Sequence, residues 1–252
     1  MIELKKPQEI EKIRSANQIV AQTLDFLQGE LRAGLSLKEL SLMAEDFILS
    51  KGAKPSFKGL YGFEGAICTS LNAVCIHGTP TETKLKEGDI IGLDVGVLKD
   101  GFYGDAARTL GVGKISEQDS ALIACAKDAL YYAIESIKTG MHFKQLSSMI
   151  EAFIRERGFV PLLGYCGHGI GSKPHGEPEI PNYLEPGKSP KSGEKIKNNM
   201  VFCLEPMICQ KDGTPVHLRG NWDAASKDGL NTAHWEHCVA VLNGRAHILS
   251  QA

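Results

Sequence analysis

The sequence predicts an α/β (α+β) fold in which two helix–strand halves, related by a pseudo-twofold, contribute strands to an antiparallel sheet. Residues 31–55 and 137–161 align without a gap and share ten identities in 25 positions, which indicates a duplicated unit. Helical periodicity alternates with β-rich runs in both halves. Between two such runs, Asp100-Gly101 is the turn signal of an antiparallel hairpin.

The repeat also predicts the domain organisation. Two long copies favour a duplicated domain over a solenoid, because a solenoid needs three or more units. We therefore expect a single domain over residues 1–252, with halves of about 1–113 and 114–252. The length alone would also permit two small domains. A hydrophobic fraction of 42 % is enough for a full core.

Start and stop signals place the helices. Pro7 can open a first helix, whose apolar residues between 10 and 31 recur roughly on one face. A second helix is predicted to end near Gly52. Ser116 with Asp119 resembles a capping box, although a weaker one than usual, and predicts the start of a third helix. The second to fourth helices are expected over residues 37–51, from 116 to about 137, and 143–157.

β-Rich runs place the strands. They are expected near residues 65–77, 90–98, 102–112, 165–172, 200–209 and 233–242. The stretch PNYLEPGKSPKSGEKIKNN, residues 181–199, is rich in proline, glycine and lysine, which is typical of a connector with a solvated face.

The predicted hairpin brings two aspartates together. If Asp100 and Gly101 form a two-residue turn, Asp105 lies opposite Gly96, and Asp94 is its diagonal neighbour on the same sheet face. Solvent-facing aspartates on a hairpin are the plain alternative. An aspartate inside the apolar run IIGLDVGV argues against it, because unpaired charge there is costly.

The repeat extends to further polar residues. His77 in HGTP matches His175 in HGEP, while Glu205 and Glu236 match Asp94 and Asp105 in apolar strand-like runs. His168, in GYCGHGIG, has no counterpart. Salt bridges would be the ordinary reason for each buried glutamate. A pseudo-twofold that brings four carboxylates to one centre instead indicates a shared metal site.

The ligand types indicate which metals fit. Four carboxylates cannot all stay ionised together without cations between them. Oxygen ligands with a single histidine suit Mn, Co, Fe or Zn better than an all-thiolate structural zinc site would. Two such cations about 3.5–4 Å apart can catalyse hydrolysis, because they make hydroxide from bound water and bind the reacting oxygens. The sequence therefore predicts a dinuclear centre made of Asp94, Asp105, His168, Glu205 and Glu236.

Composition excludes several other classes. The net charge is 28 − 30 = −2, so no basic field attracts nucleic acid or a lipid surface. We see no apolar stretch of membrane-spanning length and no apolar signal core near the first residue. Seven cysteines without a CxxC motif are expected to be free thiols in a reducing cytoplasm.

These motifs resemble the type I methionine aminopeptidases in their short bacterial form, over essentially the whole chain. The carriers are SLNAVCIHGTP, IIGLDVGVLKDGFYGDAART, GYCGHGIGSKPHGEPEIPNY, FCLEPM and NTAHWEHCVAV. The resemblance implies the pita-bread fold and two divalent ions (Co, Mn, Fe or Zn). It implies removal of the initiator methionine from nascent chains whose second residue is small. We also expect a cytoplasmic monomer with a possible transient ribosome contact.

The resemblance further implies roles for individual residues. Asp94 and Glu236 would chelate one metal, Asp105 and Glu236 would be shared, and His168 and Glu205 would complete the other. A bridging hydroxide would attack the scissile carbonyl, with Glu205 as proton acceptor. The catalytic histidines would be His175 at the carbonyl oxygen and His77 at the scissile amide. Turn residues that cap backbone groups are the plain alternative for both.

By alignment, the methionine pocket would contain Phe63, Cys68 and Trp222, for which ordinary core packing is the alternative. Three positions depart from the family pattern: Tyr103, Pro174 and Gly176. They put the pocket shape in doubt and leave the ligands untouched. The other histidines are expected on the surface or packed in strands; they are His142, His217, His234, His237 and His247.

Three rival functions share this pattern. An Xaa-Pro peptidase on the same fold would usually carry an additional N-terminal domain, whereas the repeat here begins near the first residue. A pseudoenzyme that docks on ribosomes or RNA need not keep metal ligands and would be expected to show a basic patch. A creatinase-like hydrolase without metal would leave four carboxylates crowded and uncompensated.

Overall fold

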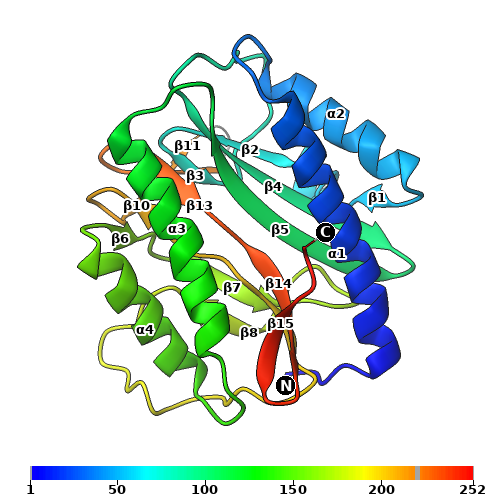
Figure 1. The fold of residues 1–252 in the computed structure, drawn as a ribbon, viewed down its shortest axis with the longest axis vertical. Coiled ribbons are helices and arrows are strands. Elements are labelled where there is room, and N and C mark those ends of the chain that lie inside the picture. Colours follow the sequence, from blue (N-terminus) through cyan, green and yellow to red (C-terminus); the bar gives the residue numbers. More distant parts are fainter. Residues whose placement is uncertain (1, 219–221, 252) are drawn as a thin grey trace.

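The computed structural model describes residues 2–218 and 222–251, and Figure 1 shows helices beside a central layer of strands. Helices α1 and α2 lie on one side of that view and α3 and α4 on the other. Within the described residues the helices are α1 (Pro7–Glu30), α2 (Leu37–Ser50), α3 (Glu117–Ser136), α4 (Phe143–Glu156) and the short 3₁₀ helix η1 (Leu60–Gly62).

The strands fall into two groups along the chain. The first group is β1 (Lys54–Pro55), β2 (Cys68–Leu71), β3 (Val74–Ile76), β4 (Ile90–Lys99) and β5 (Phe102–Gly111). The second group is β6 (Val160–Pro161), β7 (Cys166–Gly169), β8 (Gly176–Pro181), β9 (Val201–Leu204), β10 (Met207–Cys209), β11 (Pro215–Leu218), β12 (Asp223–Ser226), β13 (Thr232–His234), β14 (His237–Leu242) and β15 (Arg245–Ile248). The strand pairs described are antiparallel.

The predicted hairpin register is confirmed. Strands β4 and β5 pair over their full lengths around Asp100-Gly101, with Asp105 opposite Gly96 and Asp94 opposite Ala107. Both turn residues have positive φ, 49° and 80°, which is the conformation that a two-residue hairpin turn requires. The long hairpin supplies the backbone on which one half of the site is built.

The duplication is visible in the local geometry of the two halves. Gly34 and Gly140 precede α2 and α4 with the same φ of 93°, a value that favours glycine. After the helices, β1 pairs with β4 and β6 pairs with β10. The predicted cap is present on α3, where Ser116 accepts a hydrogen bond from the backbone of Asp119, and Ser36 caps α2 in the same way. The predicted mixed fold with duplicated antiparallel halves is therefore confirmed.

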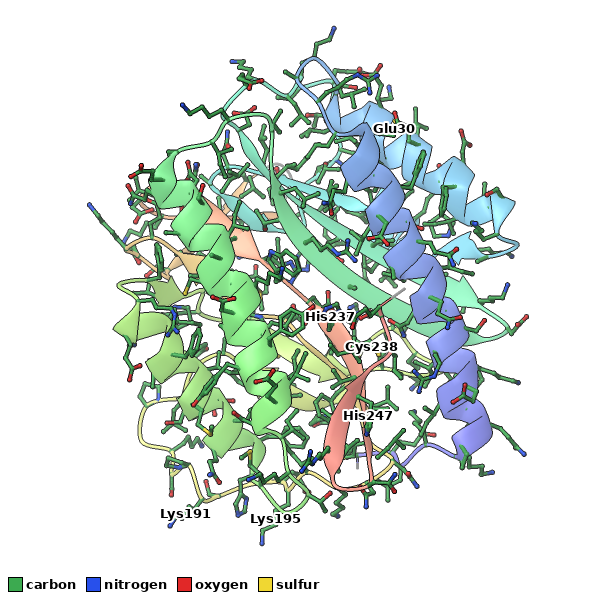
Figure 2. All side chains as sticks on the ribbon, in the orientation of Figure 1. Glu30, Lys191, Lys195, His237, Cys238 and His247 are labelled. Carbon is green, nitrogen blue, oxygen red and sulfur yellow. The ribbon has the colours of Figure 1, made fainter. Side chains whose placement is uncertain are left out.

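Each half has its own apolar core under its helices. Leu24, Leu40 and Val95 belong to the core that α1 and α2 form with β4 and β5. Leu130 and Ile150 of α3 and α4 pack with Phe202 of β9. Figure 2 shows Lys191 and Lys195 at the edge of the molecule, and both are exposed, as predicted for the polar connector.

Two predicted strands are interrupted at their glutamates. The run 200–209 is divided into β9 and β10 at Glu205-Pro206, where proline removes a backbone donor. The run 233–242 is divided into β13 and β14 at Trp235-Glu236. At this second break the backbone pairs with another strand: the Glu236 N–H donates to the carbonyl of Ala107 on β5 at 2.9 Å. This bond joins the second half to β5 of the first.

Candidate metal centre

Asp94 and Asp105 are held on adjacent strands by buried backbone contacts. Both side chains are buried, with 8 % and 4 % of their surface exposed. The backbone N–H of Asp105 donates to Asn17 Oδ1 of helix α1 at 3.1 Å. The helix can approach because Gly104 lacks a side chain, and an added Cβ would lie 2.7 Å from Asn17 N. Helix α1 therefore fixes the position of the Asp105 backbone.

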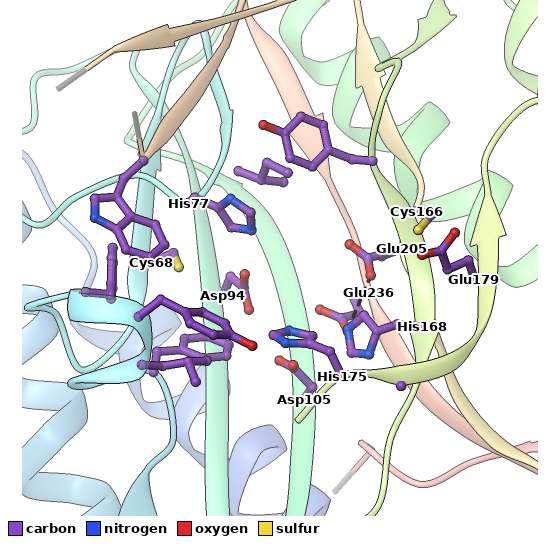
Figure 3. Close-up of a pocket in the computed structure, with 18 of the residues that line it drawn as sticks. Cys68, His77, Asp94, Asp105, Cys166, His168, His175, Glu179, Glu205 and Glu236 are labelled. Carbon is purple, nitrogen blue, oxygen red and sulfur yellow. Dashed lines mark ion pairs between the residues drawn. The ribbon is translucent and has the colours of Figure 1, made fainter. Parts of the chain in front are cut away.

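Glu205 and Glu236 come from the opposite half and lie where strands break. Asn182, directly after β8, donates from Nδ2 to the Glu205 carbonyl at 2.8 Å. This backbone oxygen therefore has a hydrogen-bond partner although strand β9 ends just before it. The Glu236 backbone is paired with Ala107. Figure 3 shows these two carboxylates facing Asp94 and Asp105 across the cavity.

His168 completes the group from strand β7. Its Nε2 lies 3.5 Å from Glu205 Oε1, and its ring meets that of His175 edge to face at 4.5 Å between centroids. Burial lowers the pKa of His168 to about 3, with a further contribution from His175. The imidazole is therefore neutral at ordinary pH, which is the form that binds metals.

Burial dominates the electrostatics of the carboxylates, and their crowding adds to it. Oxygens of Asp94, Asp105 and Glu236 lie within 4.8 Å of one another. Burial raises the pKa of Asp94 to about 6. It also raises the pKa values of Asp105, Glu205 and Glu236 well above their usual range, with neighbouring carboxylates adding to the effect. Without cations, this centre holds protons that ordinary carboxyl groups would release.

The donor set fits divalent cations. One oxygen each of Asp94, Asp105 and Glu236 is buried and has no hydrogen-bond partner within residues 2–218 and 222–251. Buried polar atoms are normally paired, so three convergent unpaired oxygens indicate that something else satisfies them. Carboxylate oxygens with one imidazole suit Mn, Co, Fe or Zn. The five predicted ligands are thus brought together around one space.

His77 and His175 face this space from the two copies of the HGxP motif. His77 has a φ of 57°, and the turn after it is anchored by Thr79, whose N–H and hydroxyl both donate to Asp223 Oδ1. A strained residue held by its surroundings is typical of a functional site. Burial lowers the pKa of His77 to about 4 and lowers that of His175 as well. Both rings are therefore neutral near pH 7.

An apolar cavity of about 590 Å³ opens beside the carboxylates. Phe63, Cys68 and Trp222 lie together on its wall, and the rings of Phe63 and Trp222 meet edge to face at 5.4 Å. Other residues that line the cavity were not among the predictions: Phe57, Leu60, Tyr61, Ile76, Tyr165, Cys166, Glu177 and Glu179. Phe57, Leu60 and Tyr61 lie outside the motifs quoted above, so only the folded arrangement assigns them to the cavity. The other five lie inside two of those motifs, which was the available signal.

The residues that depart from the family pattern lie at different places. Tyr103 packs against an apolar cluster that includes Ile10 and Ile170, and it does not line the cavity. Gly176 begins β8 and lines the cavity, whereas Pro174 does not. The space beside His175 is therefore shaped by a glycine.

One histidine lies closer to the site than the sequence indicated. His234 was expected on the surface or packed in a strand; it is buried on β13, and its Nε2 lies 3.6 Å from Glu205 Oε2. Its spacing of two residues from Glu236 was the available signal, because such residues share a face of an extended strand. His142 is half-buried, His217 and His247 are exposed, and His237 is buried on β14, where its ring contacts Tyr131 of α3 and Ser250. Figure 2 labels His237 and His247.

The fold and the clustered ligands together define a metallopeptidase, and comparison with known families agrees. Residues 11–243 match the description "Metallopeptidase family M24", so the chain belongs to that family. The methionine aminopeptidase of Helicobacter pylori (strain 26695) is 59% identical over 250 residues, with 99% of both chains covered. Methionine aminopeptidase 1 of Bacillus subtilis is 38% identical over 251 residues, with 100% of both covered. The resemblance to methionine aminopeptidases is confirmed.

Solved structures give the same result. The methionine aminopeptidase of Thermotoga maritima superposes with a TM-score of 0.95 and 34% identity, with 100% of both chains covered. The prolidase of Pyrococcus furiosus superposes with a TM-score of 0.81 and 24% identity, over 99% of this chain and 65% of that one, which shows a shared fold alone. The pita-bread fold is confirmed. None of the helices described has the length and apolar character needed to span a membrane.

Proposed function

We propose that this chain removes the initiator methionine from nascent proteins whose second residue is small. The observation that carries the proposal is the set of unpaired, convergent carboxylate oxygens beside an apolar cavity. The similarity to methionine aminopeptidases over nearly the whole chain supports it. The substrates are the free N-termini of peptides that begin with methionine.

Two divalent ions per chain are held by the five predicted ligands. Asp94 and Glu236 would hold one ion, Asp105 and Glu236 would be common to both, and His168 and Glu205 would hold the other. When bound, such ions (Co, Mn, Fe or Zn) act as Lewis acids on the scissile carbonyl and make bound water a stronger nucleophile at neutral pH. The family supports the use of metal; the count and the ligand roles are part of this proposal.

The chain's own groups handle the proton and the substrate. Glu205 accepts the proton of the attacking water on a carboxylate oxygen. His175 donates to the carbonyl oxygen as that oxygen gains charge, and His77 contacts the scissile amide. Phe63, Cys68 and Trp222 hold the methionine side chain, whose thioether suits an aromatic and sulfur-containing wall.

The setting of the reaction is the cytoplasm. The seven cysteines are free, which fits a reducing compartment. The net charge of −2 provides no basic field for a nucleic acid, so we propose no nucleic-acid partner. We further propose that the chain acts as a monomer, forms a single domain and touches the ribosome only transiently.

Release of methionine from Met-Ala-Ser and Met-Leu-Ser tests the proposal, with metal-free protein titrated with Mn, Co, Fe or Zn. We expect metal-dependent release from the alanine peptide and little from the leucine peptide. Ala-Pro peptides test the alternative of an Xaa-Pro peptidase, which the shared fold with prolidase suggests. Cleavage of Ala-Pro with no release from Met-Ala-Ser would favour that alternative.

His175→Ala tests the role of the second HGxP histidine. Loss of one donor to a developing oxyanion typically lowers kcat about 10²–10³-fold. We expect a fall of that order with unchanged metal stoichiometry, measured by steady-state kinetics and calorimetry. Near-normal turnover in a folded variant would contradict the assigned role.

A further inference from the structure

The reaction proposed above does not use one buried histidine beside its proton acceptor. Only 2 % of the surface of His234 is exposed, and its Nε2 has no hydrogen-bond partner in the part of the chain that the structure describes. This nitrogen lies 3.6 Å from Glu205 Oε2. Unpaired buried nitrogens are rare, so one aimed at a carboxylate indicates a contact with that carboxylate.

The backbone of His234 is fixed to the strand that carries Asp105. Its N–H donates to Thr109 Oγ1 at 2.8 Å, and the Thr109 hydroxyl donates to its carbonyl at 2.9 Å. Thr109 lies on β5, four residues beyond Asp105 and on the same face. Two bonds to one buried side chain hold the backbone of His234 in place beside the metal centre.

The two oxygens of Glu205 face different partners. Oε1 faces His168 Nε2 at 3.5 Å, and Oε2 faces His234 Nε2 at 3.6 Å. We propose that His234 is a positioning residue that donates from Nε2–H to Glu205 Oε2, fixing that carboxylate so that Oε1 is left for the cation shared with His168. This inference rests on the proposed metal centre.

Chemistry supports this direction of donation. An ionised carboxylate can only accept, so a proton must lie on the facing nitrogen of a neutral imidazole. Metal-binding carboxylates are commonly hydrogen-bonded by such outer partners, whose removal typically lowers metal affinity or activity 10–100-fold.

The test compares His234→Gln with His234→Asn. The glutamine amide can reach the position of Nε2, whereas the asparagine amide is too short. Mn²⁺ binding to the metal-free protein is measured by calorimetry, without peptide. We expect His234→Asn to weaken the binding about 10–100-fold and His234→Gln to stay close to wild type. Equal affinity of His234→Asn and wild type, or equal loss in both variants, would overturn the proposal.

His237→Asn is the matched control. His237 is also 2 % exposed, but its ring faces Ser250 and Tyr131 rather than Glu205. We expect its loss to lower Tm and leave Mn²⁺ affinity unchanged. The same loss of affinity in this control would show a general packing effect and overturn the proposal.

A spectroscopic measurement on the wild-type chain avoids any folding defect of the variants. In the protein loaded with Zn²⁺, ¹⁵N chemical shifts of His234 should show the proton on Nε2, and a proton on Nδ1 alone would overturn the proposal. Because Mn²⁺ binding is measured without substrate, the two proposals fail separately. A wild-type chain that binds Mn²⁺ but releases no methionine would refute the enzymatic function alone.

Discussion

Charge crowding at single residues gives the metal-free centre its properties. Asp94, Asp105 and Glu236 each leave a buried oxygen without a hydrogen-bond partner among the residues described. Burying such groups disfavours their ionised forms unless compensating charge is present. The same residues should therefore weaken the fold without metal and strengthen it with metal.

Asp105→Asn separates these two effects. The amide cannot ionise, so repulsion from Asp94 and Glu236 is relieved in the metal-free chain. We expect Tm without metal to rise by about 2–4 °C, which corresponds to ~1 kcal/mol in a chain of this size, while binding of both ions weakens. Scanning and titration calorimetry measure the two effects. Asp46→Asn, on the exposed face of α2, is the control and should change neither.

The benefit of metal should depend on pH. A carboxyl group with a raised pKa holds its proton more tightly when folded, so its stabilising contribution is complete below the unfolded pKa and is lost as pH rises through the folded one. For Asp94 this window runs from 3.8 to about 6. His168, with a pKa of about 3, is neutral throughout most of it.

We therefore expect Mn²⁺ to raise Tm more at pH 7.5 than at pH 5. At the lower pH protons already relieve the crowding and compete with the cation for the carboxylates. Scanning calorimetry at both pH values, with and without Mn²⁺, measures the difference. An equal rise in Tm at both would count against a carboxylate-rich site.

At the residue scale, the sequence predicted which side chains come together where residue type and sequence motif pointed to the same residues. The five predicted ligands do converge. The repeat paired the four carboxylates and apolar runs implied their burial, whereas His168, without a repeat partner, was identified by its glycine-rich motif. His234 was expected on the surface or packed in a strand, because no repeat partner marks it, although it lies two residues before Glu236 in the motif NTAHWEHCVAV. Its distance from Glu205 depends on how β13 is placed against β9, which local sequence does not determine.

At the scale of elements, helix α1 is part of the site's support. Asn17 has no exposed surface; its Nδ2 donates to Ile13 O of its own helix, and its Oδ1 accepts from the Asp105 backbone. Asn17→Leu keeps the shape approximately but leaves that backbone N–H unpaired. We expect a loss of about 1–3 kcal/mol in unfolding free energy and weaker Mn²⁺ binding, measured by denaturant titration and calorimetry.

Thr23→Val provides the comparison on the same helix. Thr23 is equally buried, but its hydroxyl donates only to Ile19 O within α1. We expect some loss of stability with unchanged Mn²⁺ affinity. If both variants weakened metal binding alike, general damage to the helix would be the explanation rather than the contact with Asp105.

Elements with strong local signals were predicted well, and interrupted ones were not. The turn at Asp100-Gly101 determined the register of β4 and β5, and the Ser116 cap located the start of α3. Breaks at Glu205 and Glu236 were missed because apolar residues continue on both sides. Strands β8, β11, β12 and β15 were also missed: β8, β11 and β15 pair with their sequence neighbours β7, β12 and β14, whereas β12 also pairs with the distant β3.

At the scale of the whole molecule, we propose that the two halves unfold together. The backbone bonds between Ala107 and Glu236 cross between the halves, and the proposed ligands come from both. Circular dichroism reports helices of both halves, whereas the two tryptophans, Trp222 and Trp235, lie only in the second.

We expect unfolding followed by circular dichroism and by tryptophan fluorescence to coincide, and Mn²⁺ to shift both curves equally. Coincident transitions indicate one cooperative unit. Separate midpoints, with only one of them moved by Mn²⁺, would show two independently folding domains and contradict the proposal of a single domain over residues 1–252.

The division of the centre between halves has a consequence for how the protein is made. The ribosome synthesises Asp94 and Asp105 long before His168, Glu205 and Glu236. An emerging first half can fold its hairpin, yet it lacks most of the proposed ligands and carries two aspartates with nothing to balance them. An enzyme proposed to act on newborn chains would thus pass through its own synthesis inactive, and would become competent only when its second half closes over the first.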